Sequence, residues 1–185
     1  MLRELAVLLL DAFVQGFAGL LFFRFLLQWL RAPLRNSAGE FIMALTDWVV
    51  LPARRHIPAW HGLDSASLLL AYGVEILYLG LLLTVQGAGV SPQGLLVWAV
   101  VKLMVMAVYL LMAALLVQAI LSWTNPHTPL APLLNAITQR FLAPIRRVIP
   151  LLGGIDLSPL VLLVVCQAAL IIPIALLNNL ALRLM

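Results

Sequence analysis

The sequence predicts an all-α membrane protein with four transmembrane helices in two parallel-oriented repeats. Three observations lead to this fold class. The 185 residues are 64% hydrophobic and only 10% charged, with a mean hydropathy of +1.12, whereas soluble domains have about a quarter of their residues charged. Four apolar stretches are each long enough to cross a bilayer, and a motif with paired arginines occurs twice.

The apolar stretches cover residues of about 5–30, 66–86, 95–123 and 159–182. Each meets the requirement of about 20 apolar residues for a helix that spans the hydrocarbon core. Helix is expected because an isolated strand would leave its backbone groups unpaired in lipid. Two long connections join the stretches, together with one short polar turn at 87–94 that is rich in glycine.

The repeated motif reads P-x-R-R-x-I-P-x-x-x-G-x-D, at 52–64 and again 92 residues later at 144–156. Each copy precedes an apolar stretch, so the chain divides into a first repeat, 1–90, and a second repeat, 91–185. Because each repeat crosses the membrane twice, both enter it in the same direction. Parallel repeats imply a pseudo-twofold axis along the membrane normal.

Each long connection contains a segment with helical periodicity that is too short and too polar to span. We expect two amphipathic helices on the membrane surface, ended by Pro52 and Pro144, because proline lacks the backbone donor. In the first helix the apolar face comprises Phe41, Ile42, Leu45, Trp48 and Val49, and the polar face comprises Glu40, Thr46 and Asp47. In the second helix the apolar face comprises Leu133, Leu134, Ile137, Phe141 and Leu142, and the polar face comprises Asn135, Thr138, Gln139 and Arg140.

The distribution of basic residues predicts the orientation. Seven arginines lie in the two long connections, whereas the short turn has no basic residue and the termini add only Arg3 and Arg183. The positive-inside rule places both long connections, with their surface helices, in the cytoplasm and both termini outside. The net charge of +4 and the pI near 10.0 therefore indicate contact with anionic phospholipids rather than with nucleic acid.

The paired arginines of the motif are the first candidate binding residues. Arg54 with Arg55, and Arg146 with Arg147, lie between a surface helix and the start of a spanning helix. The flanking prolines indicate a fixed backbone that could hold a lipid phosphate or another anion. The alternative is that these arginines only fix topology and anchor the chain to head groups.

Asp64 and Asp156 close the two motifs just before a spanning helix, and Ser158 follows the second. Aspartate or serine at an N-cap, with proline soon after, is a typical helix start. A salt bridge back to the arginine pair is the other role expected for the two aspartates, and the two roles are compatible.

Charged residues within the apolar stretches form a third group. Asp11, Arg24 and Lys102 are shallow enough for their side chains to reach the nearest surface. Glu75 lies close to mid-membrane, and the repeat offset pairs it with Gln167 at the same depth. The two could form a polar centre for an ion or proton, or hydrogen bonds that fix the bundle.

The remaining signals argue against catalysis and metal binding. His56 and His61 are replaced by Val148 and Gly153 in the second repeat, and the single cysteine, Cys166, lies within an apolar stretch. Together with the absence of nucleophile–base or phosphate-loop patterns, these features predict a non-enzymatic protein without a metal or cofactor.

The two motif copies, each preceded by a surface segment, make the chain resemble the YggT family (also called YlmG-like) in a tandem two-repeat form. The second copy, P-I-R-R-V-I-P-L-L-G-G-I-D-L-S-P from Pro144 to Pro159, is the closer match, whereas the first departs from it at His56, Trp60 and His61. The resemblance implies an integral protein of the bacterial inner membrane or the thylakoid, without an established enzymatic activity. It also implies a loose association with osmotic tolerance, cell division and plastid cofactor assembly.

Two functions remain open from the sequence. The first is a scaffold or adaptor that binds anionic lipid and a protein partner or second copy, in envelope or osmotic-stress physiology. The second is a small oligomeric ion-handling protein that uses Glu75 and Gln167.

Overall fold

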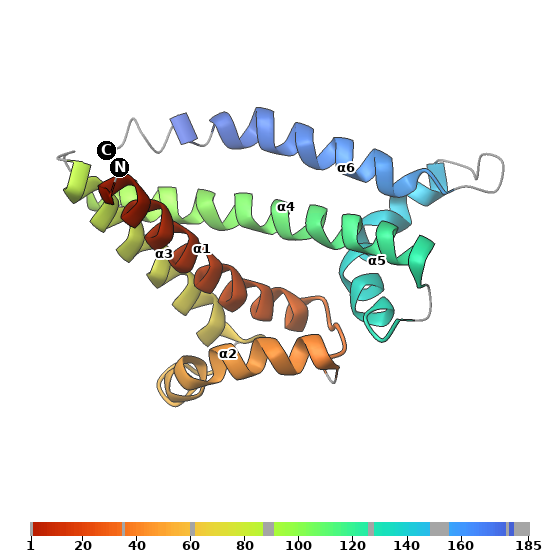
Figure 1. The fold of residues 1–185 in the computed structure, drawn as a ribbon, viewed down its shortest axis with the longest axis horizontal. Helices are drawn as coiled ribbons and strands as arrows, with labels where there is room; N and C mark the ends of the chain where they lie inside the picture. The colour runs from red at the N-terminus through yellow and green to blue at the C-terminus, as the bar shows by residue number, and fades with distance from the viewer. Residues whose placement is uncertain are drawn as a thin grey trace.

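The computed structural model describes residues 2–34, 36–59, 62–86, 91–125, 128–148, 156–176 and 178–179. Every regular element in these ranges is a helix (Figure 1). In chain order they are α1 (Leu2–Trp29), α2 (Ser37–Arg54), α3 (Ser65–Gln86), α4 (Pro92–Thr124), α5 (Ala131–Val148), α6 (Ser158–Ala169) and the π-helical segment η1 (Leu170–Ile174).

Three helices are long and apolar enough to cross a membrane. They are Val7–Trp29, Ser65–Val85 and Pro92–Ser122, with mean hydropathies of 1.7, 2.1 and 2.5. These segments agree with three of the four predicted spans. The predicted fourth span, 159–182, begins as the short apolar helix α6 and continues into η1, and its end lies outside the described residues. The four-span architecture therefore stays a prediction.

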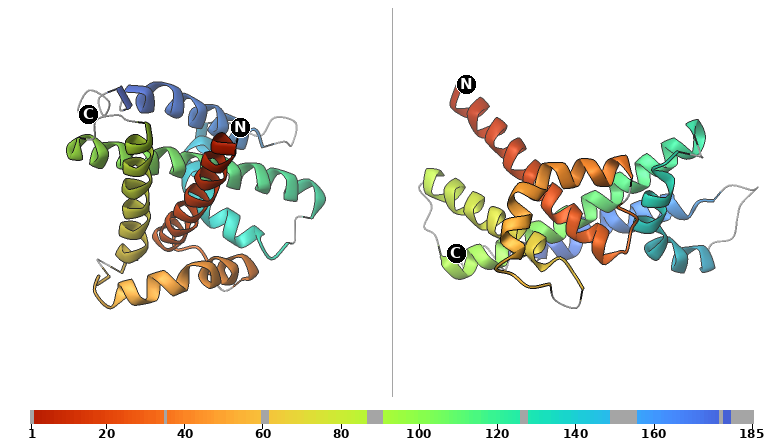
Figure 2. Two further views of the ribbon diagram at one scale, coloured as in Figure 1. Left: turned by 60° about the vertical axis from the view of Figure 1, so that its left-hand side comes forward. Right: turned by 90° about the horizontal axis from the view of Figure 1, so that it is seen from below.

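The helices form two antiparallel pairs (Figures 1 and 2). In the first half α1 packs along α3, and in the second half α4 packs against α6. The pairs cross obliquely and meet where α3 and α1 contact α4. The connecting helices α2 and α5 lie at the same end of both pairs, where α1 and α4 finish.

A buried apolar cluster joins α2 and α5 to the ends of the long helices. Its fully buried members come from α1, the loop after it, α2, α4 and α5: Leu27, Ala32, Ile42, Ala114, Leu133, Leu134 and Ile137. On the outside, large apolar side chains such as Phe13 and Leu77 are 77% and 75% exposed. An apolar outer surface of this kind is what lipid-facing helices present.

Local geometry explains where the connecting helices begin and end. Asn36 caps α2 by accepting a hydrogen bond from the Gly39 backbone N–H (2.8 Å). A Cβ atom at Gly39 would overlap the carbonyl group of Leu34, so this position requires glycine. The expectation that Pro52 and Pro144 end the helices is wrong, because both lie inside the last turns. Proline interrupts only the bond from its own nitrogen, and the chain continues helical to Arg54 and Val148.

The buried faces of α2 and α5 also differ from the prediction. Thr46 and Thr138, which were placed on the polar side, are fully buried, whereas Phe41 and Trp48 are 62% and 69% exposed. The reason is that each connecting helix packs against the spanning helices through a stripe that includes its threonine. Phe41, Leu45 and Trp48 of α2 are left on its outer side, whereas Ile42 and Val50 are buried.

Candidate functional site

The motif of the first half forms a compact corner between α2 and α3. Arg54 makes two hydrogen bonds to Asp64, from Nη2 to Oδ2 (2.6 Å) and from Nε to Oδ1 (3.1 Å). Asp64 is 3% exposed and also accepts a hydrogen bond from the Ser67 hydroxyl (2.6 Å), three residues into α3. Asp64 therefore caps α3 and pairs with the motif arginine at the same time.

The electrostatics of this corner favour the ionised pair. Burial acts to raise the pKa of Asp64, but hydrogen bonds from Arg54 and Ser67 outweigh it and hold the pKa below its ordinary value. The bond to Asp64 likewise raises the pKa of Arg54. The corner is thus held together by charge at neutral pH.

Arg24 completes the first corner from α1. Its side chain is buried, and its Nη1 donates to Thr46 Oγ1 (2.7 Å) and to Asp47 Oδ1 (2.6 Å). Its Nε lies 3.5 Å from Asp64 Oδ2. The charge of Arg24 is thus paired with the carboxylates of Asp47 and Asp64, and its reach to the membrane surface stays a prediction.

The second motif forms a similar but more open corner between α5 and α6. Arg146 Nε donates to Asp156 Oδ2 (2.9 Å), across the same ten-residue separation as in the first half. Asp156 Oδ1 accepts from the Ser158 backbone N–H (2.9 Å). Burial acts to raise the pKa of Asp156, whereas the bonds from Ser158 and Arg146 lower it below its ordinary value. The Asp156 side chain is 30% exposed, against 1% for Asp64.

The buried threonine contact also recurs in the second half. Thr138 Oγ lies 2.8 Å from Gln118 Oε1, and Gln118 occupies the place on α4 that Arg24 occupies on α1. The neutral Gln118 needs no carboxylate partner. This difference accounts for the one ion pair of the second corner, against three in the first, among the residues that the structure describes.

The helix-cap role predicted for Ser158 is not what the structure shows. Ser158 is the first residue of α6, and the N-cap residue, Leu157, makes no side-chain cap hydrogen bond. The Ser158 hydroxyl is buried without a hydrogen-bond partner in the described ranges. Asp156 binds the first free N–H group of α6 instead.

The second arginine of each pair has a different environment from the first. Arg55 and Arg147 are exposed, and within the described residues no ion pair or side-chain hydrogen bond involves them. The doubled arginine therefore divides into a structural member, Arg54 or Arg146, and a solvent-facing member. The sequence pattern alone does not distinguish the two.

The predicted pairing of Glu75 with Gln167 is wrong. Glu75 is fully buried on α3 and accepts a hydrogen bond from Gln15 of α1 (3.3 Å), whereas Gln167 is exposed on α6. α3 is enclosed by α1, α2 and α4, but α6 packs mainly on α4 and α5. Equal position in the repeat therefore gives the two side chains unequal surroundings.

Asp11 and Lys102 lie near Glu75. Tyr78 donates a hydrogen bond to Asp11, and Lys102 of α4 is close enough to attract a negative charge on Glu75. Sequence reasoning missed Gln15 and Tyr78, although each lies one helical turn from a charged residue that it had identified. That spacing on a spanning helix is the signal that could have found them.

Of the three histidines, only His56 is described. It is exposed, with Nδ1 3.3 Å from the Pro52 carbonyl oxygen, whereas His61 and His127 lie outside the described residues. Over the described ranges, no three His, Cys, Asp or Glu side chains gather in a way that could hold a metal ion.

The fold and the two corners define a class: helical proteins with apolar helices long enough to span a membrane and an arginine–aspartate corner in each half. The family model CCB3/YggT matches residues 4–85 and again 97–177. The chain belongs to this family, in a tandem form in which each half matches separately.

Curated bacterial relatives are similar to the chain over most of their length. The chain is 34% identical to the uncharacterized protein PA0392 of Pseudomonas aeruginosa, over 97% of this chain and 92% of that protein. It is 38% identical to an uncharacterized protein in the proC 3' region of Vibrio alginolyticus, over 79% and 80%. With the uncharacterized protein YggT of Escherichia coli K12 the identity is 32%, over 83% and 81%. No solved structure matches the chain.

Proposed function

We propose that the protein is a non-enzymatic scaffold of the inner membrane whose two corners bind the phosphates of anionic lipids. The observation that carries the proposal is the division of each arginine pair. Arg54 and Arg146 hold the corners through aspartates, and this leaves Arg55 and Arg147 exposed, each at the end of a rigid connecting helix. An exposed guanidinium without an ion pair in the described structure is well suited to a phosphate oxygen.

The outer side of α2 supports the same interpretation. Phe41, Leu45 and Trp48 are 62%, 40% and 69% exposed and follow one another at helical spacing. Exposed aromatic and leucine side chains next to arginine are typical of a helix that lies in the head-group region. The positive-inside rule then favours the cytoplasmic leaflet for α2 and α5 and the outer side for both termini.

As a scaffold, the protein would also bind a partner protein or a second copy of itself. The surface proposed for this contact is the end of the bundle where α2 and α5 lie. We place this role in envelope or osmotic-stress physiology, following the family resemblance. The ion-handling alternative loses one of its two proposed residues, because Gln167 is exposed on α6 and Glu75 has Gln15 as its partner.

The lipid proposal is tested with protein reconstituted in bilayers of phosphatidylcholine containing spin-labelled phosphatidylglycerol. The double variant Arg55→Ala with Arg147→Ala removes two basic groups, each worth about 1 kcal/mol near an anionic surface. We expect the relative association constant of the labelled lipid to fall by up to about 30-fold. The double variant with lysine at both positions keeps the charge and is the matched control. An alanine variant that keeps the full lipid preference would refute the proposal.

A further inference from the structure

A second polar cluster lies in the spanning part of the bundle, away from α2 and α5. It contains Asp11 and Gln15 from α1, Glu75 and Tyr78 from α3, and Lys102 from α4. Its centre is Glu75, which is 0% exposed. Glu75 Oε2 accepts the 3.3 Å bond from Gln15, and Glu75 Oε1 has no hydrogen-bond partner in the described part of the chain.

The surroundings of Glu75 do not suit a permanent negative charge. An ionised carboxylate in an apolar interior is very unfavourable unless it is paired and fully hydrogen-bonded. Lys102 is near enough to attract such a charge, while Asp11 repels it. No ion pair joins Lys102 to Glu75 among the described residues. A neutral carboxylic acid satisfies this environment at lower cost.

Among the described residues, the polar side chains near Glu75 lie toward one end of the bundle. Tyr78 lies one helical turn further along α3 and donates a hydrogen bond to Asp11, which is exposed. In the opposite direction, toward α2 and α5, the next layer is the buried apolar cluster Leu21, Phe22, Val50, Ala71 and Leu103. The route from Glu75 to the surface therefore opens at the N-terminal end of α1.

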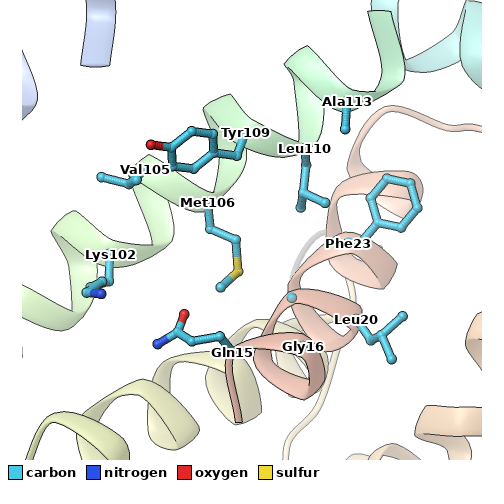
Figure 3. Close-up of a pocket in the computed structure, with 11 residues that line it drawn as sticks. Gln15, Gly16, Leu20, Phe23, Lys102, Val105, Met106, Tyr109, Leu110 and Ala113 are labelled. Carbon is cyan, nitrogen blue, oxygen red and sulfur yellow. The ribbon is translucent and has the colours of Figure 1, made fainter. Parts of the chain in front are cut away.

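An open groove adjoins the cluster at Gln15 and Lys102. The groove lies between α1 and α4, has a volume of about 500 Å³, and is lined by Gln15 and Lys102 at one end and by apolar residues such as Phe23 and Leu110 elsewhere (Figure 3). Gln15 thus contacts Glu75 and also faces the groove. Its amide is the only described side chain that bonds to Glu75.

We propose that Glu75 is a proton-binding site inside the membrane, reached from the N-terminal end of α1 through Asp11 and Tyr78 and closed toward α2 and α5. Because access is one-sided, the site binds a proton but does not conduct it. The ligand is a proton and not a metal ion, since no three carboxylate, histidine or cysteine side chains gather within the described ranges. This inference is independent of the lipid-binding proposal.

Infrared spectroscopy of the reconstituted protein tests the site directly. A protonated carboxyl gives a C=O stretch that is separate from the bands of ionised carboxylates, and exposed Asp and Glu are ionised at about pH 7. We expect this band at neutral pH in the wild type, its loss in Glu75→Gln, and its retention in the control Glu40→Gln, which changes an exposed glutamate on α2. A wild type without the band at neutral pH would overturn the proposal.

Two further measurements test the assignment and the route. Dicyclohexylcarbodiimide reacts with protonated carboxyls in membranes, so peptide mass mapping of the treated wild type should place the adduct on Glu75, even if Glu75→Gln does not fold. An adduct only on other carboxyls refutes the assignment. Tyr78→Phe should slow the shift of the carboxyl band after transfer to heavy water. An unchanged exchange rate would show that Tyr78 and Asp11 are not the route.

Discussion

The two motif corners should differ in their contribution to stability, although both contain an arginine–aspartate pair ten residues apart. The perturbation is Arg54→Ala in one variant and Arg146→Ala in another. In the first, the partner left behind is Asp64, whose side chain is 1% exposed. In the second, the partner is Asp156, whose side chain is 30% exposed. The two arginines themselves are similarly exposed, at 42% and 44%.

The size of the difference follows from the burial of the aspartates. Removing one partner of a buried ion pair costs about 3–5 kcal/mol. In the Arg54→Ala variant, Arg24 and Ser67 still contact Asp64. We therefore expect the free energy of unfolding to fall by about 2–3 kcal/mol, which is close to the cost of leaving a buried hydrogen-bond acceptor without one of its donors. A partly exposed pair is worth about 0–1 kcal/mol, which is the expectation for Arg146→Ala.

The assay is reversible unfolding of the detergent-solubilised protein, with the free energy of unfolding measured for each variant. Arg55→Ala is the matched control, because it removes a neighbouring arginine that has no ion pair in the described structure. A double variant, Arg54→Ala with Asp64→Asn, should recover part of the loss, since it removes the uncompensated charge. Equal losses for Arg54→Ala and Arg146→Ala, or a larger loss for Arg55→Ala, would show that burial of Asp64 does not set the cost.

Three other variants test separate features. Gly39→Ala should lower the unfolding temperature, because the added Cβ would overlap the Leu34 backbone. The control Gly73→Ala should leave the unfolding temperature unchanged, because the space around Gly73 is open. Equal shifts in the two variants would contradict the packing at the start of α2. Since the pKa of folded Asp64 lies below its ordinary value of 3.8, its stabilisation is complete above that value and is lost as the pH falls through the folded pKa. Asp64→Asn should therefore weaken the acid dependence of unfolding, and an unchanged acid profile would argue against the ion pair. Thr46→Val keeps the shape of the side chain but removes a hydrogen-bond acceptor from buried Arg24. We expect the free energy of unfolding to fall by about 1–3 kcal/mol. An unchanged free energy of unfolding would show that the hydroxyl is dispensable.

The relation between sequence and structure is clearest at the helices. The three described spans agree with the predicted ones to within a few residues, because an apolar stretch in lipid has no alternative to helix. The repeated motif also singles out Arg54 and Asp64 from sequence alone. Their pairing required the turn between α2 and α3, which brings residues ten apart in sequence within 2.6 Å.

The orientation of single side chains could not be predicted in the same way. Thr46 looks polar in a periodicity analysis, yet its hydroxyl donates to the Ile42 carbonyl and accepts from Arg24, so it can be buried. Gln167 has the right depth for a partner of Glu75, but α6 buries Leu162 and Cys166 and leaves Gln167 outside. In both cases the deciding factor is which neighbours cover each face of a helix.

The sequence by itself determined the class of the protein, the helices that the structure describes as spans, and the repetition of an arginine–aspartate motif in two halves. These features depend on the local composition of the chain and on the spacing between residues, and both can be read directly from the sequence. Only the tertiary structure decided which arginine of each pair is engaged, how deeply each aspartate is buried, and that Glu75 meets Gln15. Those outcomes depend on helices far apart in sequence, whose packing sets the exposure and the partners of every polar group between them.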